Sequence, residues 1–205
     1  MEREFWEQRY GEREHAYGTQ ANAFLVSQGS HIQPGMTVLA VGDGQGRNGV
    51  WLAQQGCTVL SVDYAQAGLD RALDLAANSG VSLETLCTDL FTWQWPENQY
   101  DAVVTIFVHF PPDQRARMHH KMIAACKPGG VVIFEGFSKQ QRVYQQKYQS
   151  GGPPVDALLY TRQILEQDFA GARILLMEET ETELCEGRYH SGKAAVIRLV
   201  AQREK

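Results

Sequence analysis

The sequence predicts a single α/β domain over residues 1–205, built on a mostly parallel β-sheet. From about residue 36 onward, short apolar runs alternate with segments of helical spacing, an order typical of strands joined by right-handed crossovers. Two strand-like segments near the end have no helix between them, so we expect them to form an antiparallel hairpin. The 205 residues, 43% of them hydrophobic, suit one compact domain with a full core.

Seven strands are expected. The first five are apolar runs bounded by glycine, proline or polar residues, as is typical of buried strands. In chain order they are Thr37 to Val41, Thr58 to Val62, Ser82 to Thr88, Ala102 to Val108 and Val131 to Glu135. The hairpin strands are Arg173 to Glu183 and Lys193 to Val200, joined by a polar loop around Gly187 and Gly192.

Helices are expected between the strands. Residues 47–55 form one that Gly56 ends, another spans Leu69 to Ala76, and a third follows Pro111-Pro112. A last helix covers 161–169. We expect residues 1–34 to form a helical cap segment. Residues 139–160 are expected to form an insert or lid, mobile over its polar part, 139–154.

Composition excludes several classes of function. The net charge is -5 with both signs mixed, and no Lys/Arg run provides a nucleic-acid footprint. No apolar stretch is long enough to span a bilayer, so we expect a cytoplasmic protein with a small-molecule partner. No exposed apolar stripe is evident, so the oligomeric state stays open, with a monomer or a weak homodimer expected.

The cysteines indicate neither disulfides nor a metal site. Cys57, Cys87, Cys126 and Cys185 are scattered, and no Cys/His cluster has metal-ligand spacing. We therefore predict buried, reduced thiols and no metal.

A glycine loop follows the first strand. Ligands of open parallel sheets bind beyond the carboxyl ends of the strands. Gly42, Gly44 and Gly46 allow a sharp turn and a close approach to a ligand, and the next helix points free N–H groups to the same place. Because 44–49 also fits the GxGxxG dinucleotide pattern, the loop alone leaves the cofactor open.

Two carboxylates end successive strands behind this loop. Asp63 follows the second strand, 17 residues beyond Gly46, where it can accept hydrogen bonds from both hydroxyls of a ribose. Asp89 follows the third strand and can accept from an adenine amine. Either alone is commonly a turn or helix cap. Together they favour a nucleoside site.

These features resemble the class I S-adenosylmethionine-dependent methyltransferases over nearly the whole chain. Lys127-Pro128-Gly129-Gly130 before the fifth strand is a frequent signature of that family, and the closing hairpin is its topological hallmark. Narrower motifs look like the small bacterial tellurite-resistance type. They are Gly44-Gln45-Gly46-Arg47-Asn48, Phe5-Trp6…Tyr10…Tyr17-Gly18-Thr19, and Glu186-Gly187-Arg188-Tyr189-His190.

The resemblance implies a Rossmann-like fold with strand order 3-2-1-4-5-7-6, and S-adenosyl-L-methionine as cofactor. It assigns the methionine part to Gly42, Gly44 and Gly46, the ribose to Asp63, and the adenine to Asp89 with Leu90. Ile106 to His109 would form the floor. Further cofactor contacts are expected from Tyr17, Asp43, Asn48 and Tyr64.

One position departs from the family pattern. Most members carry an acid where this chain has Ala40, and that acid usually helps to bind the methionine amine. The nearest carboxylate here is Asp43, three residues further on. The sequence leaves open whether Asp43 takes over this contact or the chain binds cofactor without catalysis.

Three residues are candidates for contact with the substrate. His109 follows the fourth strand at the edge where the methyl group should lie, although a structural histidine is an equal alternative. His190 lies in the hairpin loop beside Arg188, with an ordinary solvated loop as the alternative. If the substrate is an oxyanion, Arg188 is the side chain best suited to bind it. His119 and His120 are adjacent on a helix, cannot pair on a metal and are expected to be solvated.

Aromatic residues near the N-terminus suit a cofactor with a sulfonium group, which favours ring faces. Tyr17 is equally consistent with a cofactor contact and with packing, whereas Trp6 and Tyr10 fit a hydrophobic clamp that holds a terminal helix.

The sequence thus predicts methyl transfer from S-adenosylmethionine to a small molecule, such as a thiol or a metalloid oxyanion of the tellurite or selenite kind. A catalytically silent S-adenosylmethionine-binding protein is the alternative, supported by Ala40. An NAD(P)-dependent oxidoreductase is less consistent with the terminal hairpin and with the lack of a recognisable hydride-transfer set.

Overall fold

The computed structural model describes residues 3–12 and 14–204. Its strands are β1 (Thr37–Val41), β2 (Thr58–Asp63), β3 (Glu84–Cys87), β4 (Tyr100–Ile106), β5 (Cys126–Phe137), β6 (Ala172–Glu186) and β7 (His190–Arg203). Its α-helices are α1 (Arg3–Tyr10), α2 (Ala23–Ser27), α3 (Arg47–Gln54), α4 (Gln66–Asn78), α5 (Pro112–Ala125), α6 (Gln141–Tyr148) and α7 (Arg162–Asp168). Two short 3-10 turns, Gly29–His31 and Asp156–Leu158, complete the list.

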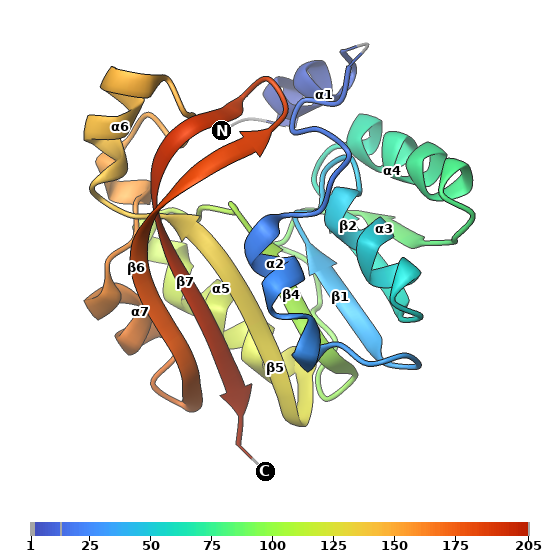
Figure 1. Cartoon of the computed structure of the whole chain (residues 1–205). Coiled ribbons are helices and arrows are strands. Elements are labelled where there is room, and N and C mark those ends of the chain that lie inside the picture. The colour runs from blue at the N-terminus through green and yellow to red at the C-terminus, as the bar shows by residue number, and fades with distance from the viewer. Residues whose placement is uncertain (1–2, 13, 205) are drawn as a thin grey trace.

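The strands form one sheet in the order β3-β2-β1-β4-β5-β7-β6, which confirms the predicted topology (Figure 1). Strands β1 to β5 pair in parallel. Strand β7 runs antiparallel to both β5 and β6. The carboxyl ends of β1, β2 and β4 therefore meet at one edge, where a ligand of a parallel sheet binds.

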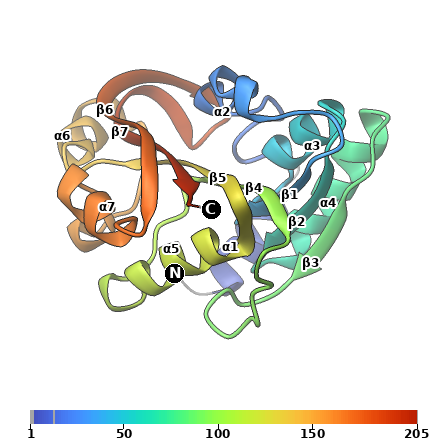
Figure 2. The same ribbon diagram turned by 90° about the horizontal axis from the view of Figure 1, so that it is seen from below.

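Helices cover both faces of the sheet (Figure 2). Along β1, Val38 and Ala40 pack in the cluster that includes residues of α2, α3 and α4, whereas Leu39 and Val41 pack with α5 and α7. Successive side chains of a strand point to opposite faces, so burial on both faces requires a continuous apolar run. This is why the short run at 37–41 could be recognised from the sequence.

Side-chain caps define where two helices begin. The Asn22 side chain accepts a hydrogen bond from the Leu25 N–H at 2.9 Å and caps α2. Thr161 caps α7 in the same way, accepting from the Ile164 N–H at 3.2 Å. Asn22 also anchors the segment after α1 to the site described below.

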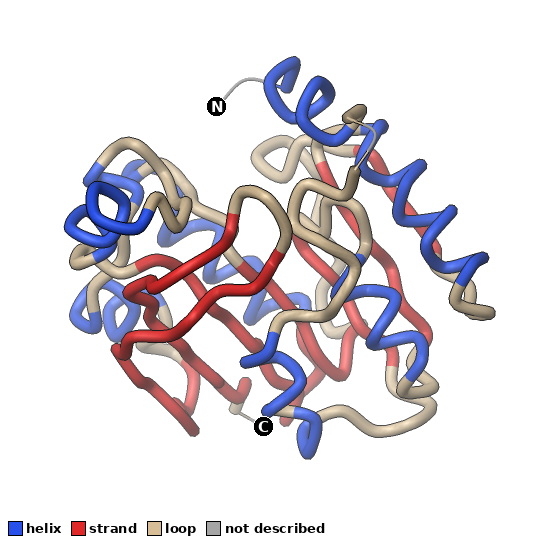
Figure 3. Tube along the Cα trace, turned by 45° about the horizontal axis from the view of Figure 1, so that its top comes forward, coloured by secondary structure: helices blue, strands red, loops and turns tan. Residues whose placement is uncertain are grey.

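The terminal hairpin is longer than predicted. Its strands extend to Glu186 and from His190, so the connection is only Gly187, Arg188 and Tyr189. Figure 3 shows the hairpin tip beside the loop that follows α1, and the Tyr189 N–H donates to the Ala16 carbonyl at 3.4 Å. His190 is therefore the first residue of a strand, not part of a loop.

Other boundaries also differ from those predicted. Strand β3 is shorter than predicted, and β4 begins two residues earlier. Strand β4 also ends two residues earlier, because Phe107 adopts φ 58° and leaves the strand. The polar insert contains α6. The fully buried Gln141 side chain holds it by donating to the Gly151 carbonyl and accepting from the Ala195 N–H.

Two predictions of side-chain environment were wrong. His119 is buried rather than solvated, with Nδ1 2.9 Å from an Asp168 oxygen that also accepts from Arg115 Nε at 2.6 Å. His120 is exposed, as predicted. Among the cysteines, Cys57 and Cys126 are buried, but Cys87 is half-buried and Cys185 is exposed, because Cys185 lies on the outermost strand, β6.

Candidate active site

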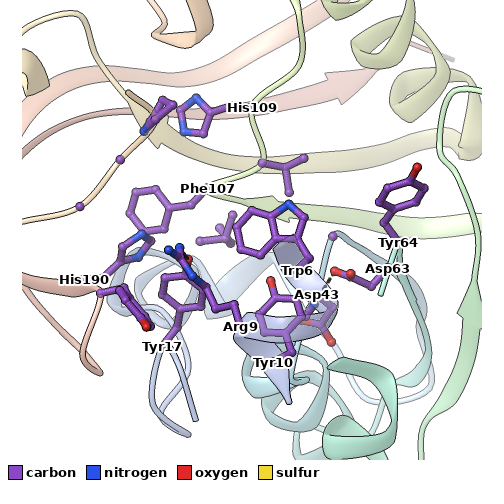
Figure 4. Close-up of a pocket in the computed structure, with 18 of the residues that line it drawn as sticks. Trp6, Arg9, Tyr10, Tyr17, Asp43, Asp63, Tyr64, Phe107, His109 and His190 are labelled. Atoms are coloured by element: carbon purple, nitrogen blue, oxygen red, sulfur yellow. Dashed lines mark hydrogen bonds between the residues drawn. The ribbon is translucent and has the colours of Figure 1, made fainter. Parts of the chain in front are cut away.

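A pocket of about 740 Å³ lies at the carboxyl ends of β1, β2 and β4 (Figure 4). Helix α1 and the tip of the β6–β7 hairpin also contribute to its walls. The pocket gathers nearly all the predicted site residues: Tyr17, Gly42, Asp43, Gly44, Asn48, Asp63, Tyr64, Asp89, Leu90, Ile106, His109 and His190. Gly46 and Arg188 do not line it.

The glycine loop is shaped by close neighbours. A Cβ on Gly42 would lie 2.5 Å from Cγ2 of Val108, and one on Gly44 would lie 2.7 Å from the Tyr10 hydroxyl. Both residues also have positive φ, which disfavours any other residue. The glycines therefore let the loop after β4 and helix α1 close on the pocket, whereas Gly46 packs beneath it against Ala72 of α4.

Asp43 caps the helix that follows the loop. Its carboxylate accepts from the Gly49 N–H, in the first turn of α3, at 3.2 Å and from the Ser61 hydroxyl at 2.6 Å. Burial raises the pKa of Asp43, and these hydrogen bonds only partly offset the effect. A carboxylate thus occupies the helix N-terminus where a dinucleotide would place its pyrophosphate. This arrangement disfavours NAD(P).

Asp63 is held at the end of β2 by backbone groups. One carboxylate oxygen accepts from the Gly44 N–H at 2.8 Å and the other from the Ala65 N–H at 2.9 Å. Burial raises the pKa of Asp63 to about 6, although both hydrogen bonds oppose the shift. Each oxygen keeps a further lone pair for a ligand, so the geometry suits the predicted contact with ribose hydroxyls.

Asp89 and Tyr64 line the same end of the pocket. Asp89 accepts from the Phe91 N–H at 2.9 Å, which fixes the turn after β3. Tyr64 is 36% exposed, so its ring is available to a ligand. Leu90 and Phe91 add apolar surface beside them. The predicted ribose and adenine residues therefore lie together.

A buried polar network lies beneath the opposite end. Glu186 accepts from Arg47 Nη2 at 2.9 Å and from Asn22 Nδ2 at 2.9 Å. The Asn22 N–H in turn donates to the Asn48 side chain at 3.0 Å. Desolvation opposes ionisation of Glu186, but its contacts with His190 and Arg47 outweigh it and lower its pKa to about 2.

His190 faces the pocket from this network. Its Nδ1 lies 3.3 Å from the Glu186 carboxylate, which can only accept, so the neutral ring carries its proton on Nδ1. The ring packs against Tyr17 and Phe107, with centroids 4.4 and 4.7 Å away. Burial lowers the pKa of His190, and Glu186 offsets this only in part. Nε2 is therefore an unprotonated acceptor at neutral pH.

His109 lines the pocket with both ring nitrogens already used. Nδ1 lies 2.7 Å from the Leu158 carbonyl, and Nε2 accepts from the Phe137 N–H at 3.4 Å. The ring stacks on Phe137 with centroids 5.7 Å apart. Burial lowers the pKa of His109 to about 4. Its geometry offers a ligand a ring face, not a proton acceptor.

Helix α1 closes the pocket with aromatic rings. Trp6 stacks on Tyr10 at 5.3 Å, and Tyr10 lies over Gly44, so these rings both clamp the helix and line the pocket. Tyr17 contacts Tyr10, with ring centroids 6.4 Å apart, as well as His190. The two roles weighed for these residues are thus compatible in the structure.

Arg188 lies apart from the other predicted residues. Its side chain is 72% exposed and lies 3.6 Å from Glu12. Sequence reasoning assigned no role to Arg9 or to Glu186. Arg9 lines the pocket from α1, and its only signal was its place between Phe5 and Tyr10 in a quoted motif. Glu186 orients His190, a role that depends on strand pairing.

Part of the chain is similar in sequence to known proteins. Residues 38–130 match the model of the methyltransferase domain family. An uncharacterised protein of Mycobacterium tuberculosis is 31% identical over 102 residues, which are 49% of this chain and 37% of that protein. The ubiquinone biosynthesis O-methyltransferase of Pseudomonas fluorescens is 33% identical over 115 residues, covering 54% of this chain and 48% of the relative. The chain thus spans less than half the length of the curated relatives it matches.

Solved structures share the fold over most of the chain. A protein studied for converting a disulfide bond into a thioacetal in echinomycin biosynthesis has a TM-score of 0.79 at 17% identity, covering 98% of this chain and 92% of that one. TehB from Haemophilus influenzae has a TM-score of 0.73 at 18% identity, covering 98% of this chain and 67% of that one. Magnesium protoporphyrin IX methyltransferase from Synechocystis, with bound S-adenosylhomocysteine, has a TM-score of 0.67 at 21% identity, covering 89% of this chain and 80% of that one.

The fold is therefore that of the class I S-adenosylmethionine-dependent methyltransferases, as the sequence predicted. Residues 38–130 match a methyltransferase domain family, in agreement with the predicted class of enzyme. No helix among the described residues is long and apolar enough to cross a membrane.

Proposed function

We propose that this protein transfers a methyl group from S-adenosylmethionine to a small molecule, such as a thiol or a metalloid oxyanion. The observation that carries the proposal is one pocket with two chemically different ends. One end holds Asp63 and Asp89 beside the glycine loop, and the other holds His190 among aromatic rings. A nucleoside cofactor fits the first end and a compact acceptor fits the second.

The residues of the first end fit S-adenosylmethionine. Asp63 presents two fixed carboxylate oxygens to a ribose, and Asp89 lies at the end of the neighbouring strand for the adenine. Gly42 and Gly44 keep the loop free of side chains where the methionine part would lie. Bound there, the cofactor supplies a methyl group activated by a sulfonium. The family match and the fold support the same cofactor.

The second end suits an acceptor that gives up a proton. His190 Nε2 is placed to take the proton of a thiol as the thiol is methylated, while Glu186 holds the ring by Nδ1. Phe107, Phe137 and the His109 ring form an apolar wall that excludes water and aligns the acceptor. Of the predicted catalytic residues, His190 has the geometry of a base and His109 that of a wall.

The likeness to TehB and the sequence resemblance to the tellurite-resistance type favour a soft acceptor.

Asp43 bears on the two alternative functions, an NAD(P)-dependent oxidoreductase and a silent binding protein. Its carboxylate occupies the N-terminus of α3, which opposes a dinucleotide pyrophosphate. The same internal contacts tie Asp43 to the loop, while Ala40 is buried in the core. A silent binding protein is therefore the second candidate.

Calorimetric titration with S-adenosylmethionine, S-adenosylhomocysteine and NAD tests the cofactor. We expect the first two to bind and NAD not to bind. Binding of NAD alone would overturn the proposal. Transfer of a labelled methyl group to thiols, selenite and tellurite then separates an enzyme from a silent protein. Cofactor binding without transfer to any of these acceptors would favour the second candidate.

A further inference from the structure

Helix α1 presents two stripes to the pocket. Trp6 and Tyr10, four residues apart, stack on each other and face the glycine loop. Phe5 and Arg9 form the second stripe, with the guanidinium 4.3 Å from the Phe5 ring centroid. Arg9 also lies 4.1 Å from the ring of Tyr189 at the hairpin tip. The second stripe therefore faces the hairpin, away from Gly44.

Arg9 is a pocket cation without an anionic partner among the described residues. No carboxylate of residues 3–12 or 14–204 lies within 4.0 Å of it, whereas Arg47 pairs with Glu186 at 2.9 Å and Arg188 lies 3.6 Å from Glu12. Its Nη1 donates to the Tyr17 hydroxyl at 3.0 Å. Phe5, Trp6 and Tyr189 surround the guanidinium with ring faces. The remaining N–H groups of Arg9 are thus positioned by packing and have no charged partner within the described part of the chain.

Tyr17 connects Arg9 to His190. Its hydroxyl accepts from Arg9, and its ring lies 4.4 Å from the His190 ring. Figure 4 shows the Arg9 side chain between Trp6 and Tyr17, directed toward His190. A cation and a neutral base therefore lie on the same side of the pocket, within the reach of one small ligand. Asp63 lies on the other side, beyond Tyr10.

We propose that Arg9 binds an anionic group of the methyl acceptor and thereby selects anions as substrates of this site. The inference rests on the proposed function and narrows its substrate class. A guanidinium with free N–H groups on an aromatic support is suited to bind carboxylates and oxyanions by paired hydrogen bonds. The anion can be the carboxylate of an organic thiol acid or a metalloid oxyanion itself.

Binding of acceptors to the complex with S-adenosylhomocysteine tests this inference without turnover. The calorimetric probes are 4-mercaptobenzoate, its counterpart without the carboxylate, 4-methylthiophenol, and selenite. We expect at least one anionic probe to bind the wild-type complex. If 4-mercaptobenzoate binds, its affinity should exceed that of the thiol without a carboxylate by about tenfold or more. In Arg9→Gln this advantage and the binding of selenite should be lost. Arg9→Lys should keep part of both.

Arg173→Gln is the control, because Arg173 is exposed near the start of β6, at the end of the hairpin ladder away from the pocket. It should leave all affinities unchanged. Binding of one anionic probe alone identifies the source of the anion. The inference is overturned if neither anion binds the complex, or if Arg188→Gln rather than Arg9→Gln removes anion binding. It is also overturned if Arg9→Gln weakens the binding of S-adenosylhomocysteine tenfold, since Arg9 would then hold the cofactor. Failure of the wild type to bind S-adenosylhomocysteine would instead refute the proposed function.

Discussion

His190 and Glu186 face each other as the last pair of the β6–β7 ladder, with Nδ1 of His190 3.3 Å from Oε2 of Glu186. The hairpin that completes the sheet thus also orients a histidine into the pocket. Arg47 holds the same carboxylate oxygen at 2.9 Å, which fixes Glu186 in place. A topological feature and a candidate base are therefore parts of one element.

Replacement of this histidine tests its role as a base. For a thiol or hydroxyl acceptor, His190→Ala should lower kcat about 100-fold or more, because general bases contribute at least this much. Affinity for S-adenosylhomocysteine should change little, since the cofactor residues are on other elements. His120→Ala, at an exposed position on α5, is the control. An unchanged kcat in His190→Ala would exclude the histidine as the base.

The pH dependence of kcat tests the pairing with Glu186. The groups that face His190 are Glu186 on β6, Arg47 on α3 and Arg9 on α1. Burial lowers the pKa of His190, so the base is neutral at pH 7 and kcat should fall only below the usual histidine range. Glu186→Gln removes the group that raises this pKa, so the acid limb should move to lower pH. If the acid limb of the kcat profile of Glu186→Gln stays at the pH of the wild type, Glu186 is merely structural.

Asp63 should be essential for cofactor binding and also support the loop. Asp63→Ala removes the proposed ribose contact, so affinity for S-adenosylmethionine should become unmeasurable by calorimetry. It also leaves the N–H groups of Gly44 and Ala65 without an acceptor, which costs roughly 2–4 kcal/mol of unfolding free energy. Denaturant titration checks the second effect. Asp70 on α4 is exposed, so Asp70→Ala is the control and should change neither the cofactor affinity nor the free energy of unfolding.

The stability of the protein should depend on His109 below neutral pH. Burial lowers the pKa of His109 to about 4 in the folded state, against about 6.5 in the unfolded chain. The unfolded chain therefore takes up the proton first, and the wild type loses about 3 kcal/mol as pH falls from 6.5 to 4. His109→Gln lacks this loss, so its stability relative to wild type should rise over that interval.

Asp63 titrates in the opposite sense, because its pKa is raised to about 6 and protonation favours the folded state. This contribution is common to both proteins and cancels in their difference. Denaturant unfolding at pH 7 and pH 4.5 is sufficient for the comparison. A difference between wild type and His109→Gln that does not vary with pH would contradict the assignment of a buried, neutral His109.

Gly42 should be intolerant of even one methyl group. Gly42→Ala places a Cβ 2.5 Å from Val108 and imposes φ of 62° on an alanine. We expect a loss of about 2–4 kcal/mol, of which about 1–2 kcal/mol is backbone strain. In the background of Val108→Ala the same change should cost only the strain. Double-mutant thermal unfolding measures the difference, and equal costs in the two backgrounds would argue against the steric contact.

The local sequence was sufficient to predict much of the fold. Continuous apolar runs indicate strands buried on both faces, and Gly42 with Asp63 indicates where two of those strands end at a ligand. The alternating pattern predicted a parallel sheet and a terminal hairpin, whereas the strand order was implied by the family resemblance. The glycine-loop end of the pocket, where we propose that the cofactor binds, could be predicted to lie at one edge of the sheet. Glycine loops and strand-end carboxylates are local signals, set by backbone conformation and strand ends.

The acceptor end depended on tertiary structure. Long-range pairing extended the hairpin to Glu186 and His190, and packing on α1 placed Arg9 beside Tyr17. Burial against Asp168 converted a surface-like His119 into a core residue, and two backbone contacts took up the nitrogens of His109. A local pattern shows which residues can carry chemistry. Which of their atoms remain free is decided by partners far away in the chain, so only the folded structure separates the proposed base, His190, from the proposed wall residue, His109.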